Sequence, residues 1–444
     1  MKKYFGTDGI RGRANQFPIT AETCLKIGMA IGAKFKNGSH RHRVVIGKDT
    51  RLSGYMIENA LTSGFTAVGM DVFLLGPVPT PAVSMLTRSL RADIGIMISA
   101  SHNPYYDNGI KVFDKNGEKL SSEIEFEIEK LIDSDCGKYL AEPQNIGKAK
   151  RLDEGKHRYI EFAKNTFEKN QDLGGLKIVL DCAHGAAYSV APTILWELGA
   201  NVVTINAAPN GYNINDNCGS TNPESLCKKV VEENADIGIA LDGDADRILI
   251  VDEKGNAIDG DKLIALIAEK LHDEGKLKKD TVVITHMSNL ALENHLAYMG
   301  INTVRVDVGD KNILEEIKKS GYNFGAEQSG HIVLNDYSTT GDGITAALQI
   351  LSILKKSNST ISQLAHSYES NPQKLKNIEI TNPNILEDQN IKDFIALKQK
   401  ELGFNGRIFI RKSGTQNLIR ILVEHVDEKI LDQVMKELVE KISG

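Results

Sequence analysis

Short apolar runs and longer amphipathic stretches alternate along most of the chain. Residues 94–98 form an apolar run whose length and β-branched content predict a strand covered on both faces. Residues 20–35 instead repeat apolar positions at helical spacing, with Thr20 as the expected N-cap. Similar runs predict further strands at 44–47, 71–75, 177–181, 201–205, 235–239, 282–284 and 324–327. Strands that alternate with helices predict parallel or mixed α/β sheets.

This pattern restarts twice and then changes. Residues 92–96 and 235–239 both read Ala-Asp-Ile-Gly-Ile, and each copy ends a strand-helix series and leads into a polar loop, which indicates duplicated domains. Past Ser367, two Asn-Pro pairs mark a linker to a few short strands and helices. We therefore predict an α/β protein with three similar mixed α/β sheet domains and a small C-terminal α+β domain around a central cleft. The predicted limits are 1–148, 149–254, 255–368 and 369–444.

Composition narrows the class of protein. The 444 residues are 41% hydrophobic and 25% charged, as in ordinary globular proteins, and a net charge of −6 provides no basic field for nucleic acid. No apolar run approaches the roughly 18 residues that span a bilayer, and the first residues lack the apolar segment of a signal peptide. Five cysteines without a C-x-x-C pair suit reduced thiols. We expect a cytoplasmic protein that binds neither nucleic acid nor membrane.

The loop after residues 94–98 concentrates polar side chains. Ser99, Ser101, His102, Asn103 and Pro104 follow the strand directly, where a rigid element can position chemistry. The same residue types also suit an ordinary turn, so the loop alone leaves both interpretations open. A hydrolase triad is disfavoured, because adjacent side chains such as those of Ser101 and His102 point apart on an extended chain.

A second loop carries three alternate carboxylates. Asp242, Asp244 and Asp246 are separated by the small residues Gly243 and Ala245, which let three oxygens meet one ion. Such a site favours a hard divalent cation, Mg²⁺ first. A solvated acidic turn is the alternative, but three like charges repel one another without a counter-ion.

The spacing of these aspartates also matches the start of an EF-hand. Arg247 stands where an EF-hand requires glycine, however, and residues 248–251 read as a strand. A calcium loop is therefore disfavoured.

Three further segments are weaker signals when each is taken alone. Residues 325–331 combine Glu327, Ser329 and His331, which suit sugar hydroxyls and proton transfer, although a single loop histidine is more often structural. Residues 411–417 join cations, hydroxyls and a glycine, as a phosphate monoester requires, and a solvated basic turn is the alternative. Residues 5–12 contain three glycines and Arg11, and they suit either an anion-binding loop or a flexible entry into the first strand.

Together and in this order, these motifs resemble the α-D-phosphohexomutase superfamily over essentially the whole chain. The residues that carry the resemblance are Phe5 to Gly12, Ile98 to Pro104, Asp107 to Lys111, Asp242 to Arg247, Gly325 to His331 and Arg411 to Thr415.

The resemblance implies roles for individual residues. It implies that Ser101 carries a phosphoryl group. The implied catalytic residues are Ser101, His102, Lys111, His331, Arg11 and Arg247. The implied ligands of one Mg²⁺ are Ser101, Asp242, Asp244 and Asp246. The implied substrate-binding residues are Glu327, Ser329, Arg411, Ser413, Gly414, Thr415 and Arg420.

The residues around Ser101 and the glutamine at position 328, Gln328, resemble those of the glucosamine branch of the superfamily. That likeness implies an isomerase that interconverts glucosamine 6-phosphate and glucosamine 1-phosphate, through glucosamine 1,6-bisphosphate as intermediate and activator. It would supply UDP-N-acetylglucosamine and cell-wall precursors. The alternatives are a phosphomannomutase or phosphoglucomutase, and a non-catalytic sugar-phosphate sensor. One departure is that Lys412 and Gln416-Asn417 stand where the family shows Pro and Glu-Pro.

Two expectations concern the whole molecule. The last domain should move, because one phosphate-binding loop must serve both orientations of the bisphosphate. The sequence does not indicate an oligomeric state, and a homodimer is compatible with it.

Overall fold

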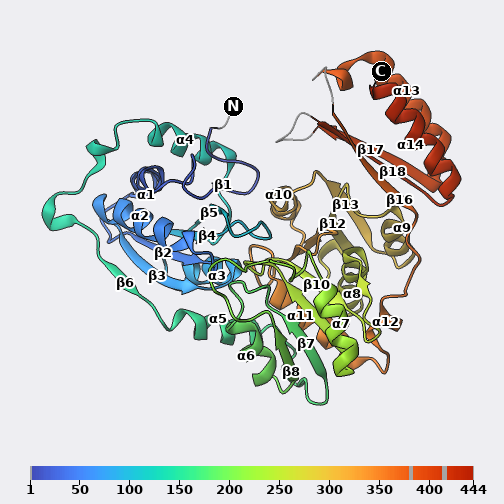
Figure 1. Cartoon of the computed structure of the whole chain (residues 1–444), viewed down its shortest axis with the longest axis horizontal. Coiled ribbons are helices and arrows are strands. Elements are labelled where there is room, and N and C mark those ends of the chain that lie inside the picture. Colours follow the sequence, from blue (N-terminus) through green and yellow to red (C-terminus); the bar gives the residue numbers. More distant parts are fainter. Residues whose placement is uncertain (1–2, 380–383, 413–417, 444) are drawn as a thin grey trace.

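The computed structural model describes residues 3–379, 384–412 and 418–443, which form four sheets with flanking helices (Figure 1). Three larger α/β units lie together, and the C-terminal unit projects from one side of them. This arrangement agrees with the predicted α/β class and its small final domain. Within these ranges, every helix is too short or too polar to cross a bilayer.

The first sheet has six strands in the order β1-β5-β4-β2-β3-β6. Its strands are β1 (Ile10–Arg13), β2 (Arg43–Lys48), β3 (Asp71–Pro77), β4 (Ile94–Ile98), β5 (Asp107–Asp114) and β6 (Ala149–Arg151). The helices of this unit are α1 (Ala21–Phe35), α2 (Ser53–Ala67), α3 (Thr80–Ser89) and α4 (Ser122–Ile132), and α5 (Gly155–Lys164) follows them. Ile94 and Ile96 pack in one hydrophobic cluster with α1 and α2, whereas Met97 packs in another with α3. The strand is therefore covered on both faces, as its apolar run predicted.

The second sheet has the order β11-β10-β9-β7-β8, and the third has the order β13-β12-β14-β15. The second unit contains β7 (Lys177–Asp181), α6 (Val190–Glu197), β8 (Asn201–Ile205), α7 (Glu224–Glu233), β9 (Ile237–Leu241), β10 (Ile248–Val251) and β11 (Ala257–Ile258). The third contains α8 (Gly260–Asp273), β12 (Thr281–Thr285), α9 (Leu290–Tyr298), β13 (Asn302–Val306), α10 (Asp310–Ser320), β14 (Phe324–Ala326), β15 (Ile332–Leu334), α11 (Gly343–Lys356) and α12 (Ile361–Leu364).

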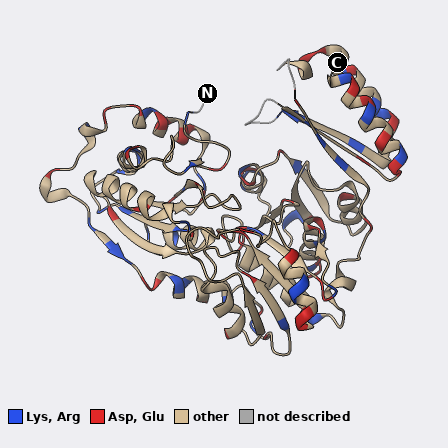
Figure 2. Cartoon of the chain, viewed as in Figure 1, with Lys and Arg blue, Asp and Glu red and all other residues tan. Residues whose placement is uncertain are grey.

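The C-terminal unit is a three-stranded antiparallel sheet, β16-β18-β17, covered by two helices. Its elements are β16 (Gln373–Glu379), α13 (Gln389–Leu402), β17 (Gly406–Lys412), β18 (Leu418–His425) and α14 (Glu428–Ser443). The buried residues of α14 recur at helical spacing, and acidic and basic side chains are interspersed on α13 and α14 (Figure 2). Amphipathic helices over one sheet give this unit an α+β core of its own.

The three larger sheets repeat one local arrangement. In each, the last parallel strand turns back through a polar loop into an antiparallel neighbour, forming β4–β5, β9–β10 and β14–β15. The repeated Ala-Asp-Ile-Gly-Ile sequence enters β4 and β9, which occupy equivalent places. The polar loops are therefore three copies of one structural position.

Two details differ from the sequence-based expectation. The second half of segment 5–12, which suited either an anion-binding loop or a flexible entry into the first strand, is itself a strand: residues 10–13 form β1, because they pair with β5 along the edge of the first sheet. By pairing, β6 belongs to the first sheet and β11 to the second, just beyond the predicted limits at residues 148 and 254. All five cysteines have free thiols.

Candidate active site

Ser101 lies in the loop that leaves the carboxyl end of β4. Its backbone has φ +52°, in the left-handed region, and its amide donates to Ser99 Oγ at 2.9 Å. Ser99 in turn donates its hydroxyl to Asp49 Oδ2 at 2.7 Å, and Asp49 follows the neighbouring strand β2. Two adjacent strand ends therefore hold Ser101 in a conformation that an isolated chain would rarely adopt.

Arg51 fixes the rest of this loop. The side chain is completely buried, and Asp49 Oδ2 accepts from its Nε at 2.8 Å. Its terminal nitrogens donate to backbone carbonyls of the Ser101 loop, namely Ser101 and Asn103 at 2.8 Å each, Asp107 at 3.0 Å, and Pro104. One guanidinium thus satisfies the carbonyls of a tightly curved segment. Asn215, from the second unit, donates to the Ser101 carbonyl at 2.9 Å.

The aspartate loop meets the Ser101 loop directly. Ser101 Oγ donates to Asp242 Oδ2 at 2.5 Å, although the two residues are 141 positions apart. The approach requires glycine at position 243, because a Cβ there would lie 2.5 Å from the Ser101 carbonyl oxygen. Asp242, Asp244 and Asp246 are all buried, and each offers an oxygen within 4.8 Å of the others. The predicted cluster therefore exists and lies at the predicted hydroxyl.

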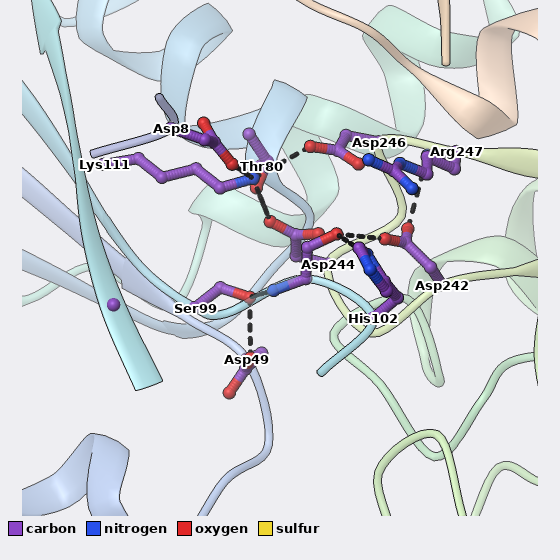
Figure 3. A network of polar contacts seen from close by, with 12 residues as sticks. Asp8, Asp49, Thr80, Ser99, His102, Lys111, Asp242, Asp244, Asp246 and Arg247 are labelled. Atoms are coloured by element: carbon purple, nitrogen blue, oxygen red, sulfur yellow. Dashed lines mark hydrogen bonds and ion pairs between the residues drawn. The ribbon is translucent and has the colours of Figure 1, made fainter. Parts of the chain in front are cut away.

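Lys111 and Thr80 balance part of this negative charge (Figure 3). Lys111 Nζ lies 2.8 Å from Asp244 Oδ2 and 2.9 Å from Asp246 Oδ2, and Thr80 Oγ1 donates to Asp244 Oδ2 at 2.5 Å. The second oxygens of Asp244 and Asp246 are buried and make no hydrogen bond with any residue that the structure describes. Unpaired carboxylate oxygens of this kind suit a hard cation, so the donor set fits Mg²⁺.

Burial and charge shift the pKa values of the site. Burial, together with the charges of Asp246 and Asp244, raises the pKa of Asp242 to about 7. Burial opposes the charged form of Lys111, but the neighbouring carboxylates outweigh it and hold the pKa of Lys111 well above its usual value. Lys111 is therefore a cation at neutral pH. Burial, then the charges of Arg247 and Arg11, lowers the pKa of His102 to about 4, so its ring is neutral beside Ser101 Oγ, 3.4 Å from Nδ1.

The third loop joins the site through His331. Its Nδ1 lies 3.7 Å from Asp246 Oδ1, and its backbone bridges to Arg247. Burial alone would lower the pKa of His331, but Asp246 and the nearby charges of Asp310 and Glu327 raise it. The aspartate cluster therefore favours the protonated form of this imidazole, the form that can donate a proton.

Glu327 and Ser329 extend this third loop, Glu327 as a buried carboxylate and Ser329 at the edge of a cavity. Glu327 Oε1 accepts from the Gly309 amide at 3.0 Å, which fixes its carboxylate. Ser329 lines a cavity of about 450 Å³ together with Arg247. Both residues come from the connection between β14 and β15, so the third hairpin loop reaches the same region as the other two.

Arg11 reaches the site from β1. Its guanidinium pairs with Asp8, which also faces Lys111 Nζ at 3.4 Å. A cavity of about 600 Å³ next to Arg11 is lined by the segment from Tyr4 to Gly9 and by Val308 to Asn312 of the third unit. The glycine-rich loop therefore borders a cleft between units, in addition to entering a strand.

Of the predicted C-terminal residues, the structure describes Arg411 and Arg420, and neither of these two makes a hydrogen bond or ion pair with Ser101 among the described residues. Arg411 and Arg420 face each other across β17 and β18, and both have a buried Nε without a hydrogen bond to a described residue. Burial, then the charge of Arg420, lowers the pKa of Arg411. Ser413, Gly414 and Thr415, with the departures at Gln416 and Asn417, lie outside the described residues. Two adjacent guanidinium groups suit an anion.

Sequence reasoning missed several residues of the site. They are Asp8, Arg51, Thr80 and Lys119, none of which the motifs singled out. Lys119 Nζ lies 2.5 Å from Asp8 Oδ1 and also pairs with Asp310, which links the first and third units. Position at the carboxyl end of a parallel strand was the available signal for Arg51 and Thr80.

Comparison with known proteins agrees with this arrangement. Four models of the phosphoglucomutase/phosphomannomutase family match in order: alpha/beta/alpha domain I at residues 2–136, domain II at 157–255, domain III at 259–370 and the C-terminal domain at 375–441. Together they cover nearly the whole chain.

Individual relatives are similar over their full length. Phosphoglucosamine mutase of Chelativorans sp. (strain BNC1) is 57% identical over 442 residues, covering 100% of this chain and 98% of the relative. The enzyme of the same name from Mesorhizobium japonicum is 57% identical over 440 residues, covering 99% and 98%.

Solved structures share the fold at low sequence identity. A phosphoglucomutase/phosphomannomutase family protein from Burkholderia thailandensis has a TM-score of 0.83 at 21% identity, covering 99% of this chain and 96% of that one. Aspergillus fumigatus N-acetylphosphoglucosamine mutase, solved with GlcNAc-6P and magnesium, has a TM-score of 0.70 at 17% identity, covering 100% and 96%. With four matching domains and relatives that are more than half identical, this chain belongs to the phosphoglucomutase/phosphomannomutase family, within the α-D-phosphohexomutases.

Proposed function

We propose that this chain is an isomerase that interconverts glucosamine 6-phosphate and glucosamine 1-phosphate. The observation that carries the proposal is the 2.5 Å contact between Ser101 Oγ and Asp242, inside a buried cluster of three aspartates. A hydroxyl bonded to one carboxylate, in a cluster whose other two carboxylates keep oxygens without hydrogen bonds to any described residue, suits a residue that carries a phosphoryl group beside a divalent cation. The substrate follows from the relatives, which are named phosphoglucosamine mutases at 55–57% identity.

Asp242, Asp244 and Asp246 would hold one Mg²⁺ together with phosphorylated Ser101. When bound, Mg²⁺ supplies positive charge that offsets the charge of the phosphate oxygens during transfer. Lys111 and Arg247 add to this positive charge, since both stay cationic in their buried positions. Phosphoryl transfer requires little covalent chemistry from the protein beyond placement and charge stabilisation.

Two transfers complete the reaction. The 1-hydroxyl of glucosamine 6-phosphate attacks the phosphorus on Ser101, so the bond to Ser101 Oγ breaks and glucosamine 1,6-bisphosphate forms. The bisphosphate turns round, and Ser101 Oγ then attacks the phosphorus at position 6, which leaves glucosamine 1-phosphate and restores phosphoserine. Each transfer removes a proton from the attacking hydroxyl and delivers one to the departing oxygen. His331, whose pKa its acidic neighbours raise, would exchange the proton of the sugar oxygen, and neutral His102 would exchange that of Ser101 Oγ: the sugar proton leaves and Ser101 Oγ gains one in the first transfer, and the reverse occurs in the second.

The other predicted residues would bind the sugar phosphate. Glu327 and Ser329 suit the sugar hydroxyls, and Arg11 suits the transferred phosphate. Arg411, Arg420 and the segment from Ser413 to Thr415 would hold the phosphate that does not react. Reduced cysteine thiols support a cytoplasmic location, where the product would serve UDP-N-acetylglucosamine synthesis.

Replacement of the carrier hydroxyl tests the mechanism. Intact-mass measurement should find one phosphate on the purified chain, mapped to Ser101, and Ser101→Ala should lose mutase activity by at least about 1,000-fold while still binding sugar phosphate. Ser39→Ala removes an exposed hydroxyl of the same unit and serves as the matched control. Full turnover by the Ser101 variant would rule out the carrier role.

A comparison of kcat/KM tests the choice of substrate. The phosphates of glucosamine, mannose and glucose would be assayed with the same preparation, and we expect glucosamine phosphate to be preferred. The full-length relatives and the intact Ser101, Asp242 and His331 disfavour a mannose or glucose mutase and a non-catalytic sensor. A preference for mannose or glucose phosphate would change the assigned substrate and leave the phosphoserine mechanism in place.

A further inference from the structure

Two histidines and one carboxylate cluster at the edge of the first sheet opposite Ser101. His40 and His42 precede β2, and Asp93 precedes β4. Ser101 follows the far end of β4, so the length of a five-residue strand, roughly 16 Å, separates the two places. Each of the three residues offers a ligand atom, and these atoms lie within 4.8 Å of one another.

The carboxylate of Asp93 is oriented toward both imidazoles. Its Oδ2 accepts from the Arg43 amide at 2.8 Å, which fixes the side chain. Its Oδ1 lies 2.8 Å from His40 Nε2 and 3.4 Å from His42 Nδ1. The hydrogen bond from the Arg43 amide to Oδ2 holds this carboxylate in one orientation, as hydrogen bonds to ligand side chains do in metal sites.

His42 is the unusual member of the cluster. Its side chain is 3% exposed, and neither ring nitrogen makes a hydrogen bond with any residue that the structure describes. Buried polar groups without partners are rare, because they lose their bonds to water and gain nothing in exchange. The ring nitrogen nearest Asp93 lies 3.4 Å from that carboxylate without a hydrogen bond, so its lone pair is available to a metal ion placed between them.

We propose that His40, His42 and Asp93 bind a divalent transition metal ion, Zn²⁺ by ligand type. Zinc takes imidazole nitrogen and carboxylate oxygen at bond lengths near 2.0–2.1 Å, which separates tetrahedral ligand atoms by roughly 3.3 Å. The separations of 2.8 and 3.4 Å lie on either side of this value. His40 is 59% exposed and free to adjust, and a water from the adjoining surface cavity of about 950 Å³ completes the coordination.

This site differs in chemistry from the aspartate cluster. Two imidazoles select zinc and its neighbours over magnesium, whereas three carboxylates without imidazole favour a hard cation. The ion would join the segment between α1 and β2 to the start of β4, and would therefore stabilise the first unit. This assignment is independent of the proposed mutase activity.

Zinc titration of the untagged chain in excess Mg²⁺ tests the assignment, because excess magnesium competes with zinc for the carboxylate cluster and much less for two imidazoles. We expect one Zn²⁺ per chain by calorimetry, a rise in Tm with Zn²⁺, and Co²⁺ absorption typical of four ligands. His40→Gln should weaken zinc binding on the order of 100-fold. Because His40 is exposed, this variant should keep the fold, and His157→Gln is the matched control with an exposed histidine elsewhere.

Asp93→Asn gives a second measurement, since an amide oxygen can still accept from the Arg43 amide while the anionic ligand is lost. It should also weaken zinc binding. The proposal is overturned if the chain binds no Zn²⁺ in the presence of Mg²⁺, or if His40→Gln and Asp93→Asn bind it as tightly as the parent chain.

Discussion

Arg51 shows how much of the site depends on one side chain that never needs to touch a substrate. It donates to the carbonyls of Ser101, Asn103, Pro104 and Asp107, and the left-handed conformation of Ser101 is stable only because such contacts surround it. Arginine suits this position since its planar fork carries five donors, whereas lysine carries three on one atom. Arg51 is thus a positioning residue for the proposed carrier hydroxyl.

Arg51→Lys should lower kcat by about 100-fold, because a displacement of Ser101 by about 1 Å is enough to misalign transfer. KM should change much less, since Arg51 lies beneath the loop and away from the sugar. Steady-state kinetics would separate the two effects. Arg151→Lys, at an exposed arginine of the same sheet, is the control. An unchanged kcat would show that the Ser101 loop keeps its conformation without the Arg51 guanidinium.

Asp242→Asn should abolish mutase activity, and added Mg²⁺ should not restore it. The substitution removes one negative charge from the cluster and keeps the size of the side chain. Magnesium binding by calorimetry should weaken at least about tenfold. Asp216→Asn changes an exposed aspartate of the same unit and should behave like the parent chain. Magnesium binding that is unchanged in Asp242→Asn would mean that the ligands lie elsewhere.

At the scale of elements, the three hairpin loops explain what the sequence could and could not predict. Ser101, the three aspartates and His331 were identified because each group follows an apolar strand segment. The end of such a strand can be recognised from the change from apolar to polar residues. Arg51 and Thr80 also follow strands that the sequence predicts. Their hydrogen-bond acceptors, however, are backbone carbonyls for Arg51 and a carboxylate distant in sequence for Thr80. Such partners depend on which strands lie side by side, and a single sequence does not specify strand order.

The start of strand β1 could not be placed from the sequence for a related reason. Residues 10–13 contain a glycine and two arginines, so their own propensity does not favour a strand. Pairing with β5 supplies the hydrogen bonds that propensity does not predict. The helix at 20–35, in contrast, carries its signal locally, and Thr20 caps it as expected by accepting from the Thr23 amide.

Asp261 joins two helices of the third unit and should make stability depend on pH. It lies in the first turn of α8 and accepts from the amide of Asn289, the N-cap of α9, at 2.7 Å. Burial raises the pKa of Asp261 to about 7, above the ordinary value in an unfolded chain. The folded state therefore holds this proton more tightly, and the stability it contributes below about pH 4 is lost as the pH rises through about 7.

Asp261→Asn should abolish that loss, because the amide stays neutral and its oxygen still accepts from Asn289. Denaturant unfolding between pH 4 and 8 should show the variant more stable than the parent chain above pH 7, by up to about 4 kcal/mol, with little difference near pH 4. Asp273→Asn, at an exposed position of α8, should show no such trend. If the free energies of unfolding of the variant and the parent chain differed by the same amount at every pH, the raised pKa of Asp261 would be contradicted.

At the scale of the whole molecule, the C-terminal unit is joined differently from the others. One hydrophobic cluster runs through the first three units, from Val45 to Leu180 to Ile284, whereas the C-terminal unit has a separate cluster around Ile421 and Leu438. Its contacts with the third unit are mainly polar. Arg407 Nη1 donates to the His286 carbonyl at 2.9 Å, and its guanidinium also reaches the Ser288 carbonyl. Polar attachment suits a domain that moves.

Arg407 and Glu424 form the centre of this attachment. They pair at 2.8 Å, Glu424 is completely buried, and the stacked rings of His286 and Phe409 lie nearby with centroids 4.7 Å apart. Removing one partner of a buried pair leaves an uncompensated charge, at a cost of about 3–5 kcal/mol. The pair lies within the C-terminal unit, but each partner also reaches the third unit: Arg407 donates to its carbonyls, and Glu424 Oε1 accepts from the Leu290 amide. A buried charge left without its partner is relieved when the unit detaches and water reaches it, so loss of Arg407 should increase detachment.

Arg407→Met should release the C-terminal unit. We expect faster proteolysis in the segment 366–372 and a larger radius of gyration by solution scattering, because the unit keeps its own core while it detaches. Adding Glu424→Gln should restore part of the attachment by removing the unpaired charge, a result that general unfolding would not give. Lys374→Met, which breaks an exposed pair with Asp432 inside the unit, should leave both measurements unchanged. Equal proteolysis of Arg407→Met and the parent chain would mean that the stacked rings and backbone contacts hold the unit without the ion pair.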